Sequence, residues 1–167
     1  MADVVTQKTA PASINAGRTL IYTTTTSNNG PSPAANAVII LYRNESQDTL
    51  NCDSDNDSIY GGKDSDLLNG RAGDDWLFGD RGDDTLSRGI GGDRFALSAN
   101  SGIDTVLNFS VGTDKFVLAE GLSFDSLQIN STANGTLLQF AATGEVLAEV
   151  FGANNTITAL GFLSLAL

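Results

Sequence analysis

The sequence has no histidine among its 167 residues and only one cysteine, Cys52. Without histidine the chain cannot form a Ser-His-Asp or Cys-His catalytic arrangement, and it lacks the commonest zinc ligand. A single cysteine excludes an internal disulfide. No apolar run is long enough to cross a membrane, and residues 1–15 lack the basic start and apolar stretch of a cleaved secretion signal. We therefore expect neither an enzyme nor a disulfide scaffold.

Basic residues are also scarce, with 9 Lys and Arg against 20 Asp and Glu, a net charge of -11 and a pI near 4.1. Such a charge repels nucleic acid and anionic lipid and attracts cations. The expected partner is a metal ion or a basic surface, with no nucleic acid and no membrane span. A chain of this length has room for one modest domain with flanking segments.

The chain divides by composition into residues 1–42, 43–96 and 97–167. In the first and last parts, stretches rich in β-branched and aromatic residues alternate with Gly, Asn and Pro clusters, which predicts strands separated by turns. No stretch has a convincing helical pattern, so the sequence predicts an all-β chain. The expected strands are 18–26, 35–42, 103–109, 115–118, 136–140 and 145–151.

The middle part contains a nine-residue unit that occurs six times without a gap from Arg43 to Ala96. Asp fills the sixth place of every unit, at Asp48, Asp57, Asp66, Asp75, Asp84 and Asp93. An apolar residue stands two places later, at Leu50, Ile59, Leu68, Leu77, Leu86 and Phe95. Gly fills the first place at Gly61, Gly70 and Gly79 and the fourth at Gly73, Gly82 and Gly91. Gly at fixed places indicates turns with positive φ or close backbone contacts.

These units resemble those of the RTX family of bacterial exported proteins, G-G-x-G-x-D-x-U-x with U apolar, most clearly in GGKDSDLLN, GRAGDDWLF and GDRGDDTLS. The resemblance implies a parallel β-roll over 43–96, in which six places form a turn, three form a strand, and like turns stack eighteen residues apart. Calcium would lie between stacked turns, bound by Asp carboxylates and by main-chain carbonyls of places one to four. The implied ligands are Asp48, Asp57, Asp66, Asp75, Asp84, Asp93, Gly70, Ala72, Gly73, Gly79, Arg81 and Gly82, for up to about four ions.

Stacking at eighteen residues implies two sets of carboxylates, in which Asp66 and Asp75 are the middle members and each serve two ions. The first two units lack Gly at both places, with Arg43, Ser46, Cys52 and Asp55 instead, so their sites should be the weakest. Magnesium fits such a site poorly because it requires a tighter octahedron. Each unit buries one apolar side chain, and this burial stabilises the fold by less than the conformational entropy lost when nine residues become ordered. We therefore expect folding to require calcium.

The sequence of the middle part also has features of three other kinds of segment. A disordered acidic linker fits the composition, but the two complete columns at spacing nine disfavour it. An EF-hand loop starting at Asp53 would need Gly where Ser58 stands, and helices on both sides. The adhesion tripeptide Arg81-Gly82-Asp83 lies inside a turn that the repeat already explains.

The two flanks are expected to form β-strand caps. Residues 3–40 resemble the opening strands of an immunoglobulin-like bacterial surface repeat, too short to close a sandwich. GIDTVLNFSVGTDKFVLAEGLSF resembles the segment that follows the roll in many RTX proteins, where it would hide the open edge of the last coil. The final FLSLAL resembles an uncleaved C-terminal secretion signal, although a buried closing strand predicts the same letters. The resemblance to a secretion signal implies one-step export to the medium or the cell surface.

Three functions compete for such a chain. We favour a structural or cell-surface calcium-binding module over a detached C-terminal module of a larger extracellular enzyme or toxin. An ice-binding or adhesive roll would need a regular Thr array, which the outward places lack. If place eight points inward, one outward face carries Tyr60, Trp76 and Phe78, with Arg94 over the ring of Trp76. We expect a flanking segment or a second chain to cover this aromatic face.

Overall fold

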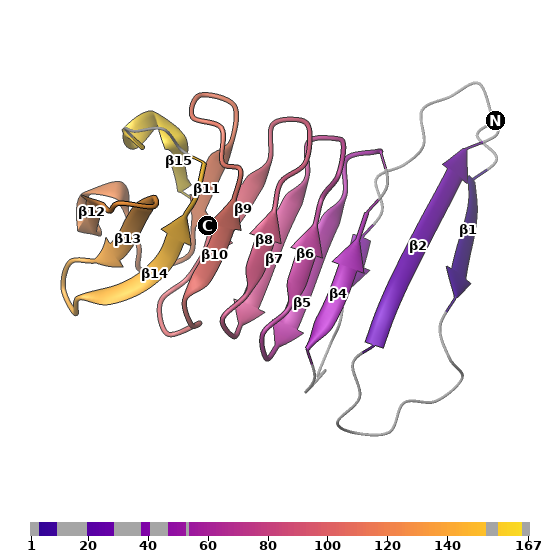
Figure 1. The fold of residues 1–167 in the computed structure, drawn as a ribbon, viewed down its shortest axis with the longest axis horizontal. Helices are drawn as coiled ribbons and strands as arrows, with labels where there is room; N and C mark the ends of the chain where they lie inside the picture. The colour runs from indigo at the N-terminus through magenta and orange to yellow at the C-terminus, as the bar shows by residue number, and fades with distance from the viewer. Residues whose placement is uncertain are drawn as a thin grey trace.

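The computed structural model describes residues 4–9, 20–28, 38–40, 47–52, 54–152 and 157–164. These residues form fifteen strands and two short 3-10 helices, Phe124–Ser126 and Ala159–Gly161, and no α-helix occurs among them (Figure 1). The all-β prediction is therefore confirmed. In the described part of the chain, no helix is both long and apolar enough to cross a membrane.

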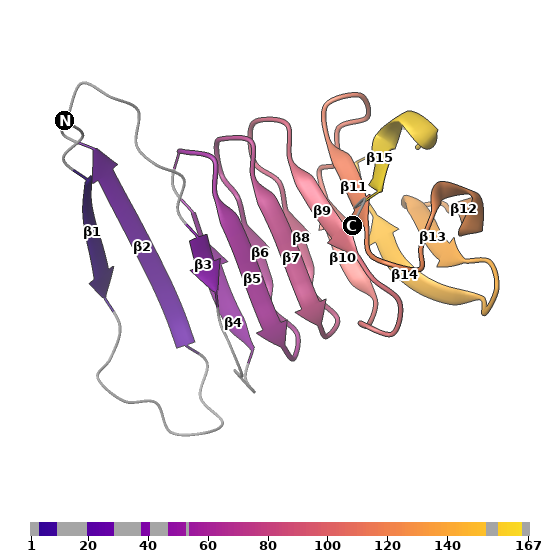
Figure 2. The ribbon, with the colours of Figure 1, turned by 180° about the vertical axis from the view of Figure 1, so that it is seen from behind.

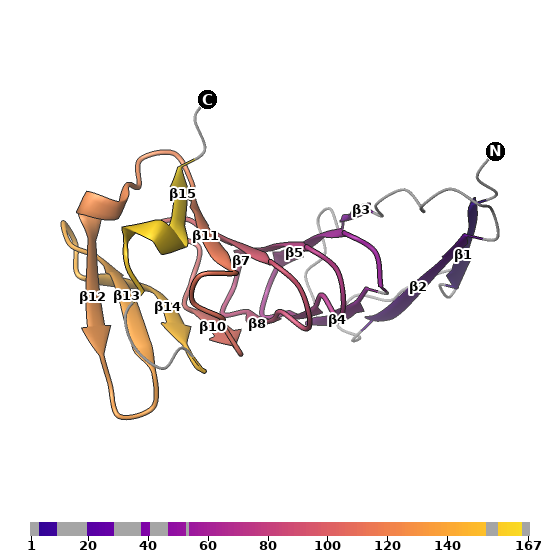
Figure 3. The same ribbon diagram turned by 90° about the horizontal axis from the view of Figure 1, so that it is seen from above.

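The middle of the chain winds into a parallel β-solenoid with two facing sheets, which Figure 3 shows as two layers. One sheet contains β4 (Asp48–Asn51), β6 (Leu67–Asn69), β8 (Thr85–Ser87) and β10 (Asp104–Leu107). The other contains β5 (Ser58–Lys63), β7 (Trp76–Arg81), β9 (Arg94–Leu97) and β11 (Lys115–Leu118). All neighbours among these strands pair in parallel. The chain thus alternates between the sheets with every repeat, as the roll predicts.

The core of the roll is the apolar column at place eight of the repeat. Leu50 pairs with Leu68, and Ile59 with Leu77, so the column stacks on itself every second unit. All six predicted side chains are fully buried, at 0% exposure. Val106 and Phe116 continue the column beyond the repeats, and the rings of Phe109 and Phe116 stack with centroids 4.5 Å apart. Each buried side chain stabilises the fold by roughly 1.5 to 3 kcal/mol.

The N-terminal strands extend both sheets at the first coil. β1 (Val4–Thr9) pairs antiparallel with β2 (Leu20–Asn28), and β2 pairs in parallel with β4. β3 (Val38–Ile40) pairs in parallel with β5 of the other sheet (Figure 2). The two expected strands are present, although residues 18–19, 35–37 and 41–42 of their expected ranges lie outside the described residues. The immunoglobulin-like resemblance stays a prediction.

The C-terminal segment covers the other end of the roll. β14 (Glu145–Val150) pairs in parallel with β10, and β13 (Thr136–Phe140) and β12 (Leu127–Ser131) follow in an antiparallel meander. β15 (Phe162–Ser164) pairs in parallel with β11. Both sheet edges of the last coil are thereby paired, which blocks association through them. The four expected C-terminal strands are present, whereas β12 was not predicted. β15 lies in FLSLAL, for which a closing strand was one of the two interpretations, and residues 165–167 of that segment lie outside the described residues.

Candidate metal centre

A buried aspartate stands at the start of every strand of the roll. The six aspartates of the repeat are joined by two more, Asp104 and Asp114, and each of the eight is at most 3% exposed. Half of them enter the β4 sheet and half enter the β5 sheet. We call these sets the Asp48 column, which contains Asp48, Asp66, Asp84 and Asp104, and the Asp57 column, which contains Asp57, Asp75, Asp93 and Asp114.

Hydrogen bonds join the members of each column in order. In the Asp48 column, the main-chain N–H of Asp48 donates to Oδ1 of Asp66 at 2.8 Å, and that of Asp66 donates to Oδ1 of Asp84 at 2.7 Å. The Asp57 column repeats this pattern from Asp57 to Asp75 at 2.8 Å and from Asp75 to Asp93 at 2.9 Å. Each of these bonds spans 18 residues. The turns therefore stack two units apart, as predicted.

On four of the eight column members, the second carboxylate oxygen is buried without a hydrogen bond. Within the described residues this applies to Oδ2 of Asp66, Asp75, Asp84 and Asp93. Burial raises the pKa of Asp66, Asp75, Asp84 and Asp104 to about 7 and the pKa of Asp93 to about 6. A buried charged oxygen without a partner strongly destabilises a fold. These atoms therefore need either protons or a cation.

The first-place glycines lie directly against these oxygens. A Cβ atom added to Gly61 would lie 2.7 Å from Oδ2 of Asp66 and 2.8 Å from the carbonyl oxygen of Gly79. A Cβ added to Gly70 would lie 2.5 Å from Oδ2 of Asp75 and 2.7 Å from the carbonyl oxygen of Arg88. Gly at place one thus lets a carboxylate oxygen and a carbonyl oxygen of the next coil approach the same point.

The fourth-place glycines make a second close approach between coils. Gly73, Gly82 and Gly91 have φ values of 129°, 142° and 135°, which favour Gly. A Cβ on any of them would collide with the place-four carbonyl of the preceding coil. Carbonyl and carboxylate oxygens gathered in this way are the hard donors that calcium prefers. The residues present therefore fit calcium.

No group of three or more Asp, Glu, His or Cys side chains converges within the described part of the chain. A cation between two aspartates would consequently draw most of its ligands from main-chain carbonyls. Among the candidates at place three, Ala72 forms a parallel bridge with Ile90, and Arg81 ends β7 opposite Lys63. These positions lie in the stacked turns, and their role as ligands stays a prediction.

Asp104 and Asp114 were missed as column members because the spacing changes after the repeats. The bond from the N–H of Asp84 to Oδ1 of Asp104 spans 20 residues, and that from Asp93 to Asp114 spans 21. The local pattern G-x-D-x-U persists, however, as Gly102, Asp104 and Val106 and again as Gly112, Asp114 and Phe116. This pattern was the signal that could have found both residues.

The two early turns, which lack Gly, are only partly described. Asp48 and Asp57 are buried at 2% exposure each, like the later column members. Arg43 and Ser46 of the first turn, and Asp53 of the second, lie outside the described residues. The weaker calcium binding expected of these turns therefore stays a prediction.

The outward aromatic face has the predicted geometry. The rings of Tyr60 and Phe78 are ladder neighbours and stack with centroids 4.3 Å apart and an interplanar angle of 5°. Trp76 lies beside Phe78 with centroids 5.9 Å apart, and the guanidinium carbon of Arg94 lies 5.2 Å from the centre of the Trp76 ring. These side chains are half-buried.

Comparison with known proteins agrees with this geometry. The family profile of the RTX calcium-binding nonapeptide repeat (4 copies) matches residues 44–75, 53–86 and 60–95. No curated protein matches the sequence significantly. Among solved structures, the chain is similar to the solution structure of a subunit of the mannuronan C5-epimerase of Azotobacter vinelandii. The identity is 25%, the TM-score is 0.51, and the match covers 80% of this chain and 81% of that one. The repeats, the parallel roll and the buried aspartates agree with this match, so residues 44–95 contain RTX calcium-binding nonapeptide repeats folded as a β-roll.

Proposed function

We propose that this chain is a non-catalytic structural module that binds several calcium ions between the coils of its roll and folds when it does so. The observation that carries the proposal is the pair of buried aspartate columns in which Oδ2 has no hydrogen-bond partner on Asp66, Asp75, Asp84 and Asp93. Calcium would supply the positive charge that these oxygens lack on Asp66, Asp75 and Asp84, whereas Oδ2 of Asp93 also lies 3.8 Å from Nε of Arg88. The columns hold the carboxylates in place, and the glycine turns bring carbonyl oxygens beside them.

The ions would lie between consecutive members of each column. We call each pair of consecutive column members a step. Hydrogen bonds join six such pairs, so there are six candidate calcium sites, two more than the four ions expected from the repeat alone. Asp66 and Asp84 would each contribute to two steps of the Asp48 column, and Asp75 and Asp93 to two of the Asp57 column. The proposed carbonyl ligands are those of Gly70, Ala72, Gly73, Gly79, Arg81 and Gly82.

Export and extracellular folding complete the proposal. RTX repeats are typical of extracellular bacterial proteins, and modules of this class bind calcium at the high concentrations found outside cells. Low cytosolic calcium would keep the chain unfolded for one-step export, and calcium would stabilise the fold after release. A second candidate, a detached module of a larger extracellular enzyme, is favoured by the similarity to an epimerase subunit over 80% of this chain.

Circular dichroism of metal-stripped protein tests the proposed function. We expect little β structure without metal, a cooperative gain of β structure with calcium, and a much smaller gain with an equal concentration of magnesium. Magnesium is the control because it has the same charge but requires a tighter octahedron. A full β spectrum in the metal-free protein at pH 8 would contradict calcium-dependent folding.

The aromatic face formed by Tyr60, Trp76 and Phe78 is proposed to contact a second copy of the chain. Tyr60 on β5 stacks on Phe78 of β7, and Trp76 lies beside Phe78 on the same strand, so the rings form one aromatic patch, a feature typical of interaction surfaces. Sedimentation at increasing concentrations of calcium-loaded protein should show association, and Phe78→Ser should weaken it. A monomer whose Trp76 emission matches that of water-exposed indole would contradict the proposal.

A further inference from the structure

The sixth repeat differs from the three before it at the place that faces the carboxylate. Gly61, Gly70 and Gly79 occupy place one in the third, fourth and fifth units, and each lies against Oδ2 of its own aspartate. The sixth unit has Arg88 at this place. In the sixth unit, a long cationic side chain therefore occupies place one, where the three preceding units have Gly and no side chain beside the carboxylate.

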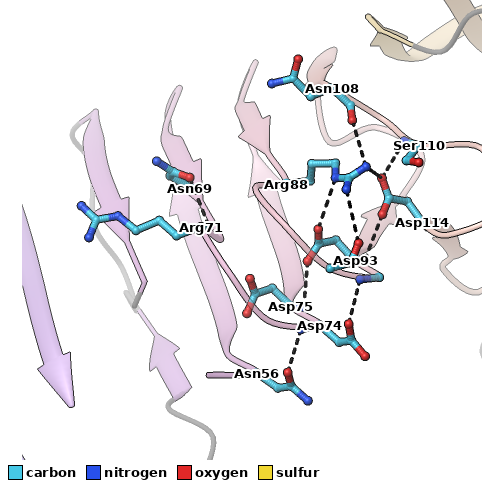
Figure 4. Close-up of polar contacts among 12 residues, drawn as sticks. Asn56, Asn69, Arg71, Asp74, Asp75, Arg88, Asp93, Asn108, Ser110 and Asp114 are labelled. Carbon is cyan, nitrogen blue, oxygen red and sulfur yellow. Dashed lines mark hydrogen bonds and ion pairs between the residues drawn. The ribbon is translucent and has the colours of Figure 1, made fainter. Parts of the chain in front are cut away.

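The guanidinium of Arg88 lies between two consecutive members of the Asp57 column. Its Nε is 3.8 Å from Oδ2 of Asp93, and its Nη1 is 3.4 Å from Oδ2 of Asp114 (Figure 4). Both carboxylates are fully buried, and the Arg88 side chain is only 17% exposed. The positive group is thus enclosed with the two carboxylates of the last step.

Main-chain carbonyls complete the surroundings of this guanidinium. Nη2 of Arg88 donates to the carbonyl oxygen of Gly91 at 3.5 Å, and Nη1 donates to that of Asn108 at 3.5 Å. Gly91 is the fourth-place glycine of the same unit, and Asn108 belongs to the next coil. Two carboxylates from stacked turns together with turn carbonyls are the donor set proposed for calcium at the other steps.

We propose that Arg88 is a built-in cation that takes the place of calcium at the Asp93–Asp114 step. The Asp57 column then binds one ion fewer than the Asp48 column, and its C-terminal step needs no metal. This inference rests on the proposed function, because it concerns how one step of the same columns is neutralised. A guanidinium can replace the ion there since it offers several donors in a fixed plane.

Ion counting by native mass spectrometry tests the proposal, with calorimetric titration as a second measurement. Arg88→Gly restores the residue of the other units and should bind about one more calcium ion than the wild type. Arg88→Lys keeps the positive charge and should bind the wild-type number. Arg94→Gln is the control for loss of a positive charge, because the Arg94 guanidinium lies over the outward Trp76 ring and not in a turn. Its count should not change.

A second pair of variants decides the question even if Arg88→Gly does not fold. Asp114→Asn should keep the wild-type number of ions, since no ion uses the last step of the Asp57 column. Asp104→Asn, at the end of the Asp48 column, should lose about one ion. Equal losses in these two variants, or an unchanged count in folded Arg88→Gly, would overturn the role of Arg88. A wild type that binds no calcium would overturn the proposed function as well.

Discussion

At the scale of the residue, Asp75 uses its two oxygens for different tasks. Oδ1 accepts a hydrogen bond from the N–H of Asp57 at 2.8 Å, which joins two coils. Oδ2 is buried without a hydrogen bond in the described structure, and burial raises the pKa of the carboxyl to about 7. An amide in place of the carboxylate would still accept the hydrogen bond from Asp57 but would carry no charge. Substitution at this position can therefore separate packing of the coils from binding of the metal.

Asp75→Asn should remove about two calcium ions but make the metal-free roll more stable than the wild type at pH 8, because the buried charge is gone and Oδ1 remains. Asp75→Ala should also remove about two ions and should destabilise both forms, since the hydrogen bond to Asp57 is lost as well. Calorimetric titration gives the ion counts, and thermal unfolding gives the stabilities.

Asp48→Ala is the matched control for these variants. Asp48 is the first member of its column and follows a turn without Gly, so this change should remove only one weak ion and leave the roll nearly intact. Losses in Asp48→Ala as large as those in Asp75→Ala would contradict the pairing of turns eighteen residues apart.

At the scale of the element, the repeated strands could be predicted because each repeats the same pattern. An Asp before the strand and an apolar residue at its centre fix the turn and the inward face of β4 to β9. This regularity predicted the place-eight core and the stacking at 18 residues. The regular spacing ends after β9, where the turns between coils contain extra residues. In these turns Asn100 and Asn108 have left-handed backbone conformations, with φ values of 58° and 60°.

The elements beyond the repeats depend on pairing that the local sequence does not specify. β14 joins β10 from 44 residues away, where Asp104 pairs with Ala148, and β15 joins β11 in a similar way. No spacing in the sequence predicts such partners. The contact of Arg88 with Asp114 was missed for the same reason, since it requires the shifted stacking of 21 residues between Asp93 and Asp114. Sequence therefore predicted the repeated part of the site, and only the structure placed its last coil.

At the scale of the whole molecule, the roll concentrates negative charge along two buried lines. The chain carries a net charge of -11, and eight of its aspartates lie in the two columns. Neighbouring members of a column repel one another, and this repulsion adds to the effect of burial on the pKa of Asp66, Asp75 and Asp84. Protons and calcium can each relieve it, so the two should compete for the folded roll.

This competition predicts how the stability of the metal-free roll depends on pH. The pKa of Asp66, Asp75, Asp84 and Asp104 rises from 3.8 to about 7 in the folded chain. The folded state therefore binds more protons than the unfolded state between about pH 4 and pH 7. Stability from these groups is fully present below pH 4 and is lost as the pH rises through 7. Metal-free protein, which should have little β structure at pH 8, should therefore gain β structure and a thermal unfolding transition at pH 5.

Saturating calcium should reverse that trend, because the ion binds the charged carboxylates and is displaced as they take up protons. Thermal unfolding followed by circular dichroism at pH 5 and pH 8, with metal-stripped and calcium-saturated protein, checks both signs. Metal-stripped Asp66→Asn/Asp75→Asn is the control: it should show a weaker pH dependence, since two of the raised groups are gone. A metal-free wild type that is equally stable at both pH values, or less stable at pH 5, would mean that the columns are neutralised by something other than protons or calcium.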